Sequence, residues 1–212
     1  MSRLYLETTI PSYLTSRPSR DLIIAGHQQV TKEWWEKRGD AFQLYISQLV
    51  VDEASAGDPV AARERLKVLQ GLPLLDITPE VTELASGILA SGRIPRKAAT
   101  DAAHIAIAAV HGMDFLVTWN CAHIANAANA KALAFICRKH AFECPVICTP
   151  EELMGEWLMA RDPIVDEVRR VREDEAAKYG FDIKAILVAS KKRQRRSKHK
   201  IVSFVPRKKL SA

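Results

Sequence analysis

The sequence has no long hydrophobic run. No apolar segment among its 212 residues approaches the roughly 20 residues that a membrane-spanning helix needs. Its first residues, MSRLYLETT, lack the parts of a secretion signal. We therefore expect a cytoplasmic protein with no membrane association.

Two motifs that mark other protein classes are also missing. No glycine-rich phosphate loop follows any candidate strand, which argues against a nucleotide-binding Rossmann enzyme. The cysteines do not have the spacing of a zinc finger. We expect all four to be buried thiols in a reducing compartment; they are Cys121, Cys137, Cys144 and Cys148.

Positive charge is concentrated at the carboxyl end of the chain. Residues 1–159 contain 15 Lys and Arg against 18 Asp and Glu, whereas residues 160–212 contain 16 against 7. The overall net charge of +6 therefore belongs to the last quarter of the chain. We expect a body at residues 1–158 and a basic tail at residues 159–212.

Within the body, short apolar runs alternate with amphipathic segments. The runs predict strands at residues 3–7, 42–46, 72–77, 115–117 and 146–148. The segments between them predict helices, among them a nearly uninterrupted apolar helix at residues 103–110. This alternation is typical of an α/β fold with a parallel sheet covered by helices on both sides.

Four polar residues occupy corresponding places in this pattern. Glu7 ends the first strand, Glu53 lies in the helix after the second, Asp101 begins the helix before the fourth, and Asn120 follows the fourth. Alone, Asp101 is most simply explained as a helix-capping carboxylate. Together, these positions converge at one edge of a parallel sheet, where three carboxylates need a divalent cation between them. Oxygen ligands favour Mg²⁺ or Mn²⁺.

Four segments carry a family resemblance: LYLETTIPSYL, VVDEAS, TDAAHIAIAA and FLVTWNCAHIANA. In this order, over residues 3–155, the chain resembles the PIN-domain ribonucleases, and more closely the VapC-like toxins of bacterial type II toxin–antitoxin systems. The resemblance implies a three-layer α/β/α domain, often dimeric, that cleaves RNA phosphodiester bonds with Mg²⁺ or Mn²⁺. It implies catalytic roles for Glu7, Glu53, Asp101 and Asn120, the first three as metal ligands.

The chain departs from the family pattern at two of these positions. The family has aspartate where this chain has Glu7 and Asn120, so we expect weaker metal binding. The resemblance also suggests that Thr8 and Thr118 support the ligands through hydrogen bonds. A weakened site leaves a second reading open, in which the protein is a non-catalytic module that binds RNA or regulates DNA.

Cationic and aromatic residues are weaker candidates. Basic residues in two loops are candidates to guide the RNA backbone, although ordinary solvated charges explain them equally well; they are Arg17, Arg20, Arg93, Arg96 and Lys97. His104 and His123 have two interpretations, as residues that face the site or, more simply, as core or surface histidines. Trp34 and Trp35 are more simply explained by core or dimer packing than by a base-stacking platform.

The tail begins with a predicted helix. Asp162 and Pro163 open it, Ile164, Val168 and Val171 form an apolar stripe, and Gly180 ends it. Because the segment resembles the small antitoxin-like partners of this toxin group, we expect it to restrain the body, in the same chain or a neighbouring one. The alternative is a disordered basic extension, rich in Lys and Arg at residues 191–200, that binds nucleic acid including DNA.

Overall fold

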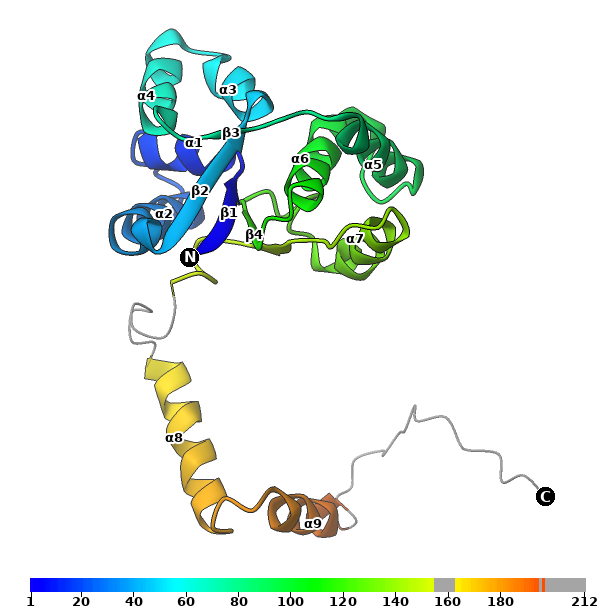
Figure 1. Ribbon diagram of the computed structural model, residues 1–212. Helices are drawn as coiled ribbons and strands as arrows, with labels where there is room; N and C mark the ends of the chain where they lie inside the picture. Colours follow the sequence, from blue (N-terminus) through cyan, green and yellow to red (C-terminus); the bar gives the residue numbers. More distant parts are fainter. Residues whose placement is uncertain (155–162, 195, 197–212) are drawn as a thin grey trace, which may run out of the picture. The chain divides into compact units, whose positions relative to one another are not determined.

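The hydrophobic segment LYL at residues 4–6 forms the middle of a parallel sheet in the computed structural model of this chain (Figure 1). The structure describes residues 1–154, 163–194 and 196. The chain divides into two units, Met1–Met159 and Ala160–Ala212, and each is described by itself.

The sheet of the first unit has five strands in the order β3-β2-β1-β4-β5, and every neighbouring pair is parallel. This confirms the predicted α/β fold. Four strands fall close to their predicted positions, but β3 has only two residues because Leu72 and Ile77 lie outside the pairing with β2. The strands are β1 (Ser2–Leu6), β2 (Phe42–Ser47), β3 (Leu74–Leu75), β4 (Phe115–Val117) and β5 (Val146–Cys148).

Helices flank the sheet in two groups, which is consistent with the predicted three-layer arrangement (Figure 1). The first group contains α1 (Thr9–Thr15), α2 (Leu22–Arg38), α3 (Gln48–Ser55) and α4 (Pro59–Leu69). The second group contains α5 (Pro79–Ala90), α6 (Ala99–Val110) and α7 (Ala127–Lys139). Two short 3₁₀ turns, η1 (Gly39–Ala41) and η2 (Arg96–Ala98), precede β2 and α6.

The core is built on β1, β4 and α6. Leu4, Leu6 and Leu116 are completely buried, and most of α6 is buried around Ile105 and Ile107. A helix enclosed in this way is apolar on nearly all sides, which explains its composition. Trp34 also packs in the core, as predicted.

Helix α2 begins at Leu22, because the Asp21 carboxylate caps the amides of Ile23 and Ile24. One detail differs from the sequence-based expectations. Cys121 is exposed rather than buried, since it lies in the turn that follows β4. All four cysteines are free thiols.

The strand order reverses direction between β1 and β4. From β1 the chain adds β2 and β3 on one side, and it then returns to add β4 and β5 on the other side. At such a switch point the connections leave the sheet in opposite directions, which opens a crevice beyond the carboxyl ends of the two central strands. Ligands of open α/β sheets bind in this crevice.

The described part of the second unit contains α8 (Pro163–Ala177) and α9 (Ile183–Gln194). Gly180 adopts a φ of 60° in the turn between them, a conformation that glycine adopts without strain. Val168 and Val171 of the predicted stripe are exposed, whereas the side chain of Ile164 lies outside the described residues. None of the described helices combines the length and hydropathy of a membrane span.

Replacing Leu116 with alanine tests the position of the core. We expect Leu116→Ala to lower the free energy of unfolding by about 2–5 kcal/mol, because a completely buried leucine leaves a cavity. The matched control is Leu74→Ala on the edge strand, where the side chain is 54% exposed and the expected loss is within about 0.5 kcal/mol. Urea denaturation followed by tryptophan fluorescence measures both, and equal losses would contradict this strand order.

Candidate functional site

Glu7 lies at the switch point, directly after β1. Its amide extends the sheet by donating to the Val117 carbonyl of β4 at 3.2 Å, and the residue is only 5% exposed. Oε2 of Glu7 accepts three hydrogen bonds, from Thr118 Oγ1 at 2.7 Å, Thr9 Oγ1 at 2.6 Å and the Thr9 amide at 3.1 Å. This buried carboxylate is therefore held in one orientation by residues that follow the two central strands.

Glu53 approaches from α3, which begins directly after β2. Its Oε2 accepts a hydrogen bond from Thr8 Oγ1 and lies 3.2 Å from His104 Nε2. Partial burial on its own would raise the pKa of this carboxyl group. Hydrogen bonds from His104, Thr8 and Thr100, together with attraction to the His104 ring, outweigh burial and hold the pKa below its usual value.

His104 lies on α6 and is 1% exposed. Its Nδ1 is 2.8 Å from the hydroxyl of Tyr5, which in turn is 2.7 Å from Ser47 Oγ. Burial raises the pKa of Tyr5 strongly, so that its hydroxyl stays protonated. A continuous hydrogen-bonded chain therefore runs from Ser47 through Tyr5 and His104 to Glu53.

Glu7, Glu53 and His104 form a group of metal-ligating side chains. Each offers one ligand atom, and these three atoms all lie within 4.8 Å of one another. Two carboxylate oxygens and one imidazole nitrogen are a suitable donor set for a divalent cation. The group fits the site predicted from the two glutamates, although its third member is a histidine.

The predicted third ligand, Asp101, lies outside this group. It occupies the first turn of α6, as expected, but its Oδ2 is 2.8 Å from Nδ1 of His123. The oxygen-only ligand set of Glu7, Glu53 and Asp101 is therefore not the set that the structure brings together. His104, which we interpreted as a core histidine, is both buried in the core and turned toward the two glutamates.

Asn120 and His123 connect Asp101 to the same edge of the sheet. The side-chain oxygen Oδ1 of Asn120 accepts a hydrogen bond from the His123 backbone amide at 3.1 Å. The backbone amide of Asn120 donates to Thr118 Oγ1 at 2.9 Å. Because Thr118 also donates to Glu7, it joins the two groups. Asn120 thus serves the described site by holding the loop after β4.

The two threonines predicted from the resemblance do bond to the glutamates. Thr118 bonds to Glu7, whereas Thr8 bonds across to Glu53 rather than to its neighbour in the sequence. Thr9 was missed by the sequence analysis. Its hydroxyl donates to Glu7 and accepts from the Trp119 backbone amide at 2.9 Å. The contact with Trp119 forms only because β1 pairs with β4.

The basic residues proposed for RNA binding are exposed. Arg17 and Arg20 lie in the loop between α1 and α2, which the buried side chain of Gln28 holds through Ser16, Arg17 and Ser19. Arg96 and Lys97 lie in η2, immediately before the helix that carries Asp101 and His104. Both sets remain candidates.

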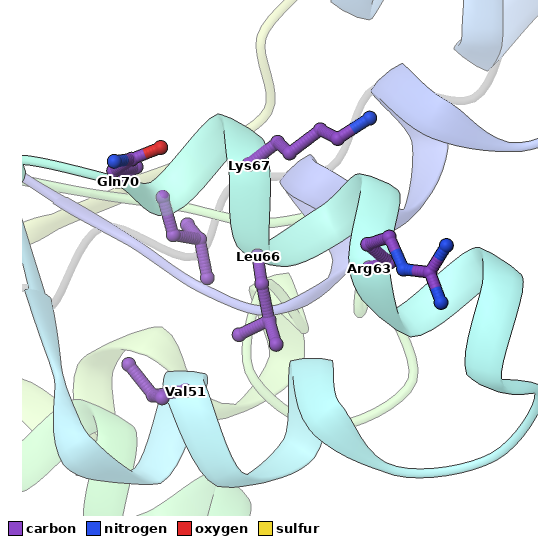
Figure 2. Close-up of a pocket in the computed structure, with 6 residues that line it drawn as sticks. Val51, Arg63, Leu66, Lys67 and Gln70 are labelled. Atoms are coloured by element: carbon purple, nitrogen blue, oxygen red, sulfur yellow. The ribbon is translucent and has the colours of Figure 1, made fainter.

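A separate apolar hollow lies between α3 and α4. Figure 2 shows Leu66 extending from α4 into the space between the two helices, with Val51 on α3 below it. The hollow has a volume of about 380 Å³ and contains no carboxylate side chain. We therefore place the candidate site at the glutamates rather than here.

Comparison with known proteins does not assign this chain to a family. No protein-family model matches the chain, and no curated protein matches it.

Removing the Thr8 hydroxyl tests the hydrogen bonding of Glu53. With a lowered pKa, ionised Glu53 stabilises the folded state above the ordinary pKa of about 4.3, and this stabilisation disappears as the pH falls through the lower folded pKa. We expect Thr8→Val to reduce the free energy of unfolding more at about pH 7 than at about pH 3. Urea denaturation in a chelating buffer measures this difference.

Thr8→Ser is the matched control for this experiment, because it keeps the hydroxyl donor. We expect its pH dependence to follow that of the unaltered protein. A loss in Thr8→Val that is the same at both pH values would show that the valine perturbs packing and that the hydrogen bond contributes nothing to the ionisation of Glu53.

Proposed function

We propose that this protein is a metal-dependent endoribonuclease related to the VapC-like toxins. The observation that carries the proposal is the group of Glu7, Glu53 and His104 at the switch point of a parallel sheet. The four sequence segments that resemble PIN domains support it, because Glu7, Glu53, Asp101 and Asn120 all belong to them.

The residues of the site have separate roles in this proposal. Glu7 and Glu53 hold Mg²⁺ or Mn²⁺, which when bound supplies a Lewis acid for water activation and for charge on the scissile phosphate. Thr9 and Thr118 fix the Glu7 carboxylate, and Thr8 fixes that of Glu53. We propose Asp101 as the third carboxylate on the basis of the resemblance, with its orientation held by His123.

The substrate in this proposal is RNA. Exposed cations at Arg17, Arg20, Arg96 and Lys97 provide the charge that a phosphate backbone needs. We propose that the protein acts in the cytoplasm, where its four free thiols remain reduced.

We further propose that the basic tail is an antitoxin-like segment that restrains the nuclease, in the same chain or across a homodimer. Exposed apolar side chains on α8, Val168 and Val171, support this because they need a partner surface. The tail is also the proposed site of any DNA binding, since residues 191–200 are strongly basic.

The alternative is a binding module without catalysis. Two observations favour it: Asn120, a neutral residue, stands where the family has an acid, and Asp101 lies outside the group of metal-ligating side chains. Such a module would bind RNA or DNA through its cations and cleave neither.

RNA cleavage by residues 1–158 tests the proposed function. We expect cleavage that requires Mg²⁺ or Mn²⁺, and we expect Glu53→Gln and Asp101→Ala to slow it by about 100-fold, since each removes charge that stabilises the transition state. Gel electrophoresis of labelled RNA measures the rate. The full chain should cleave more slowly than residues 1–158 if the tail restrains the site.

Glu83→Gln is the matched control, because Glu83 is an exposed carboxylate on α5 with a side chain that is 77% accessible. It should cleave at the unaltered rate. Cleavage that persists in a chelator would contradict the metal dependence, and RNA binding without cleavage in every form would favour the binding module.

The salt dependence of RNA binding tests the role of the α1–α2 loop. In a Glu53→Gln background, we expect Arg17→Gln with Arg20→Gln to reduce the slope of log affinity against log salt by about 1.4, because each phosphate contact contributes about 0.7 for a single strand. Fluorescence anisotropy measures the slope. The control pair, Arg63→Gln with Lys67→Gln on α4, removes two exposed cations elsewhere and should leave the slope unchanged.

A further inference from the structure

His104, and not Asp101, is the third member of the group of metal-ligating side chains formed with Glu7 and Glu53. It is almost completely buried, at 1% exposed, and its Nε2 is the atom of the ring that faces Glu53. An ordinary core histidine turns its ring nitrogens toward backbone carbonyls or hydroxyls. Here one ring nitrogen instead lies close to two carboxylates. The ligand atoms of His104, Glu7 and Glu53 are all within 4.8 Å of one another.

The other nitrogen of His104 is held by a built hydrogen-bond network. Nδ1 lies 2.8 Å from the Tyr5 hydroxyl, and that hydroxyl lies 2.7 Å from Ser47 Oγ. Tyr5 and Ser47 are themselves completely buried on β1 and β2. A histidine that ligates a metal almost always donates its second ring N–H to a fixed acceptor, which sets the tautomer and the direction of the free lone pair. The Tyr5 oxygen is available for this role.

Two proton arrangements are compatible with this network. In the first, the Tyr5 hydroxyl donates to Nδ1, and Nε2–H donates to Glu53. In the second, Nδ1–H donates to the Tyr5 oxygen, Tyr5 donates to Ser47, and Nε2 presents its lone pair to the space between Glu53 and Glu7. Both arrangements retain the two hydrogen bonds of Tyr5. The second gives up the hydrogen bond from Nε2–H to Glu53, which a cation bound by Nε2 and the carboxylates would replace.

The Glu7 carboxylate is also oriented for a ligand. All three of its donors bond to Oε2, and no other part of the described chain donates a hydrogen bond to Oε1. One oxygen is thus fixed by the protein, and the other is left for a cation. Glu53 is held in a similar way through its Oε2, by Thr8 and His104.

We propose that His104 Nε2 is a metal ligand together with Glu7 and Glu53, so that the site takes a first-row transition dication such as Mn²⁺ in preference to Mg²⁺. An imidazole nitrogen favours transition metals, whereas Mg²⁺ selects oxygen ligands. This inference rests on the proposed function for the presence of a metal, but it concerns which residues bind the metal and which metal is selected. Tyr5 is a positioning residue that acts through His104.

The test uses the full chain and Mn²⁺ alone as the probe. We expect electron spin-echo modulation from a directly bonded ¹⁴N nucleus, which changes to the ¹⁵N pattern when histidine is labelled with ¹⁵N. His104→Gln should abolish this modulation and lower the Mn²⁺ affinity measured by calorimetry by about 10- to 100-fold, with a smaller effect on Mg²⁺. The control is His111→Gln, whose ring bonds to the Asp76 carbonyl at 2.8 Å; it should keep the modulation.

Tyr5→Phe provides a second variant that leaves the imidazole in place. We expect it to keep the nitrogen modulation but to weaken Mn²⁺ binding about tenfold, because Nδ1–H loses its acceptor. A general loss of stability would instead weaken Mn²⁺ and Mg²⁺ equally. An unchanged ratio of the two affinities would overturn the positioning role of Tyr5.

The outcomes separate this inference from the proposed function. Mn²⁺ binding that depends on Glu7 and Glu53 without nitrogen modulation, or with modulation that survives His104→Gln, would overturn the role of His104 and leave the nuclease proposal intact. The absence of Mn²⁺ binding in calorimetry would overturn both. Nitrogen modulation without RNA cleavage would support the metal site and contradict the nuclease.

Discussion

The hydrogen bond from Thr118 to Glu7 joins the two central strands at the point where the site is built. Glu7 follows β1 and Thr118 follows β4, and they are 111 positions apart in the chain. The bond forms only when the two strands pair in their observed parallel register. The hydrogen bond from the Trp119 backbone amide to Thr9 depends on the same pairing.

A buried carboxylate needs this degree of support. Glu7 is 5% exposed, and an ionised group in such a position is unfavourable unless several donors surround it. A second carboxylate, Glu53, lies within 4.8 Å, so the two charges repel each other across a partly dehydrated space. The structure reduces this repulsion through hydroxyl donors and His104, and a bound cation would reduce it further. This close approach of two carboxylates beside a histidine is the observation on which the proposed metal site depends.

The network around His104 also connects the site to the core. Ser47 and Tyr5 are buried at the centre of the sheet, and His104 lies on the most enclosed helix. The orientation of the His104 ring is therefore determined by core packing. Substitutions in the core next to Tyr5 are expected to affect the site without touching it, whereas the hollow beside Leu66 is not part of this network.

The sequence by itself determined the order of the strands and helices and the positions of the two glutamates. Hydrophobic periodicity and capping residues are local properties, so they predicted an α/β fold, the apolar helix α6 and the placement of Glu7 and Glu53 near strand ends. The predicted boundaries differ from the structure where strand pairing is short, as in β3.

Only the tertiary structure decided which side chains meet. On α6, Asp101 and His104 are separated by three positions and both lie on the side of the helix that faces polar partners. Asp101 bonds to His123, and His104 bonds to Tyr5 and Glu53. By charge alone Asp101 is the better metal ligand, but the direction of each side chain depends on how α6 packs against β1 and α3. That packing involves residues about 50 to 100 positions apart, and no local pattern in the sequence records it.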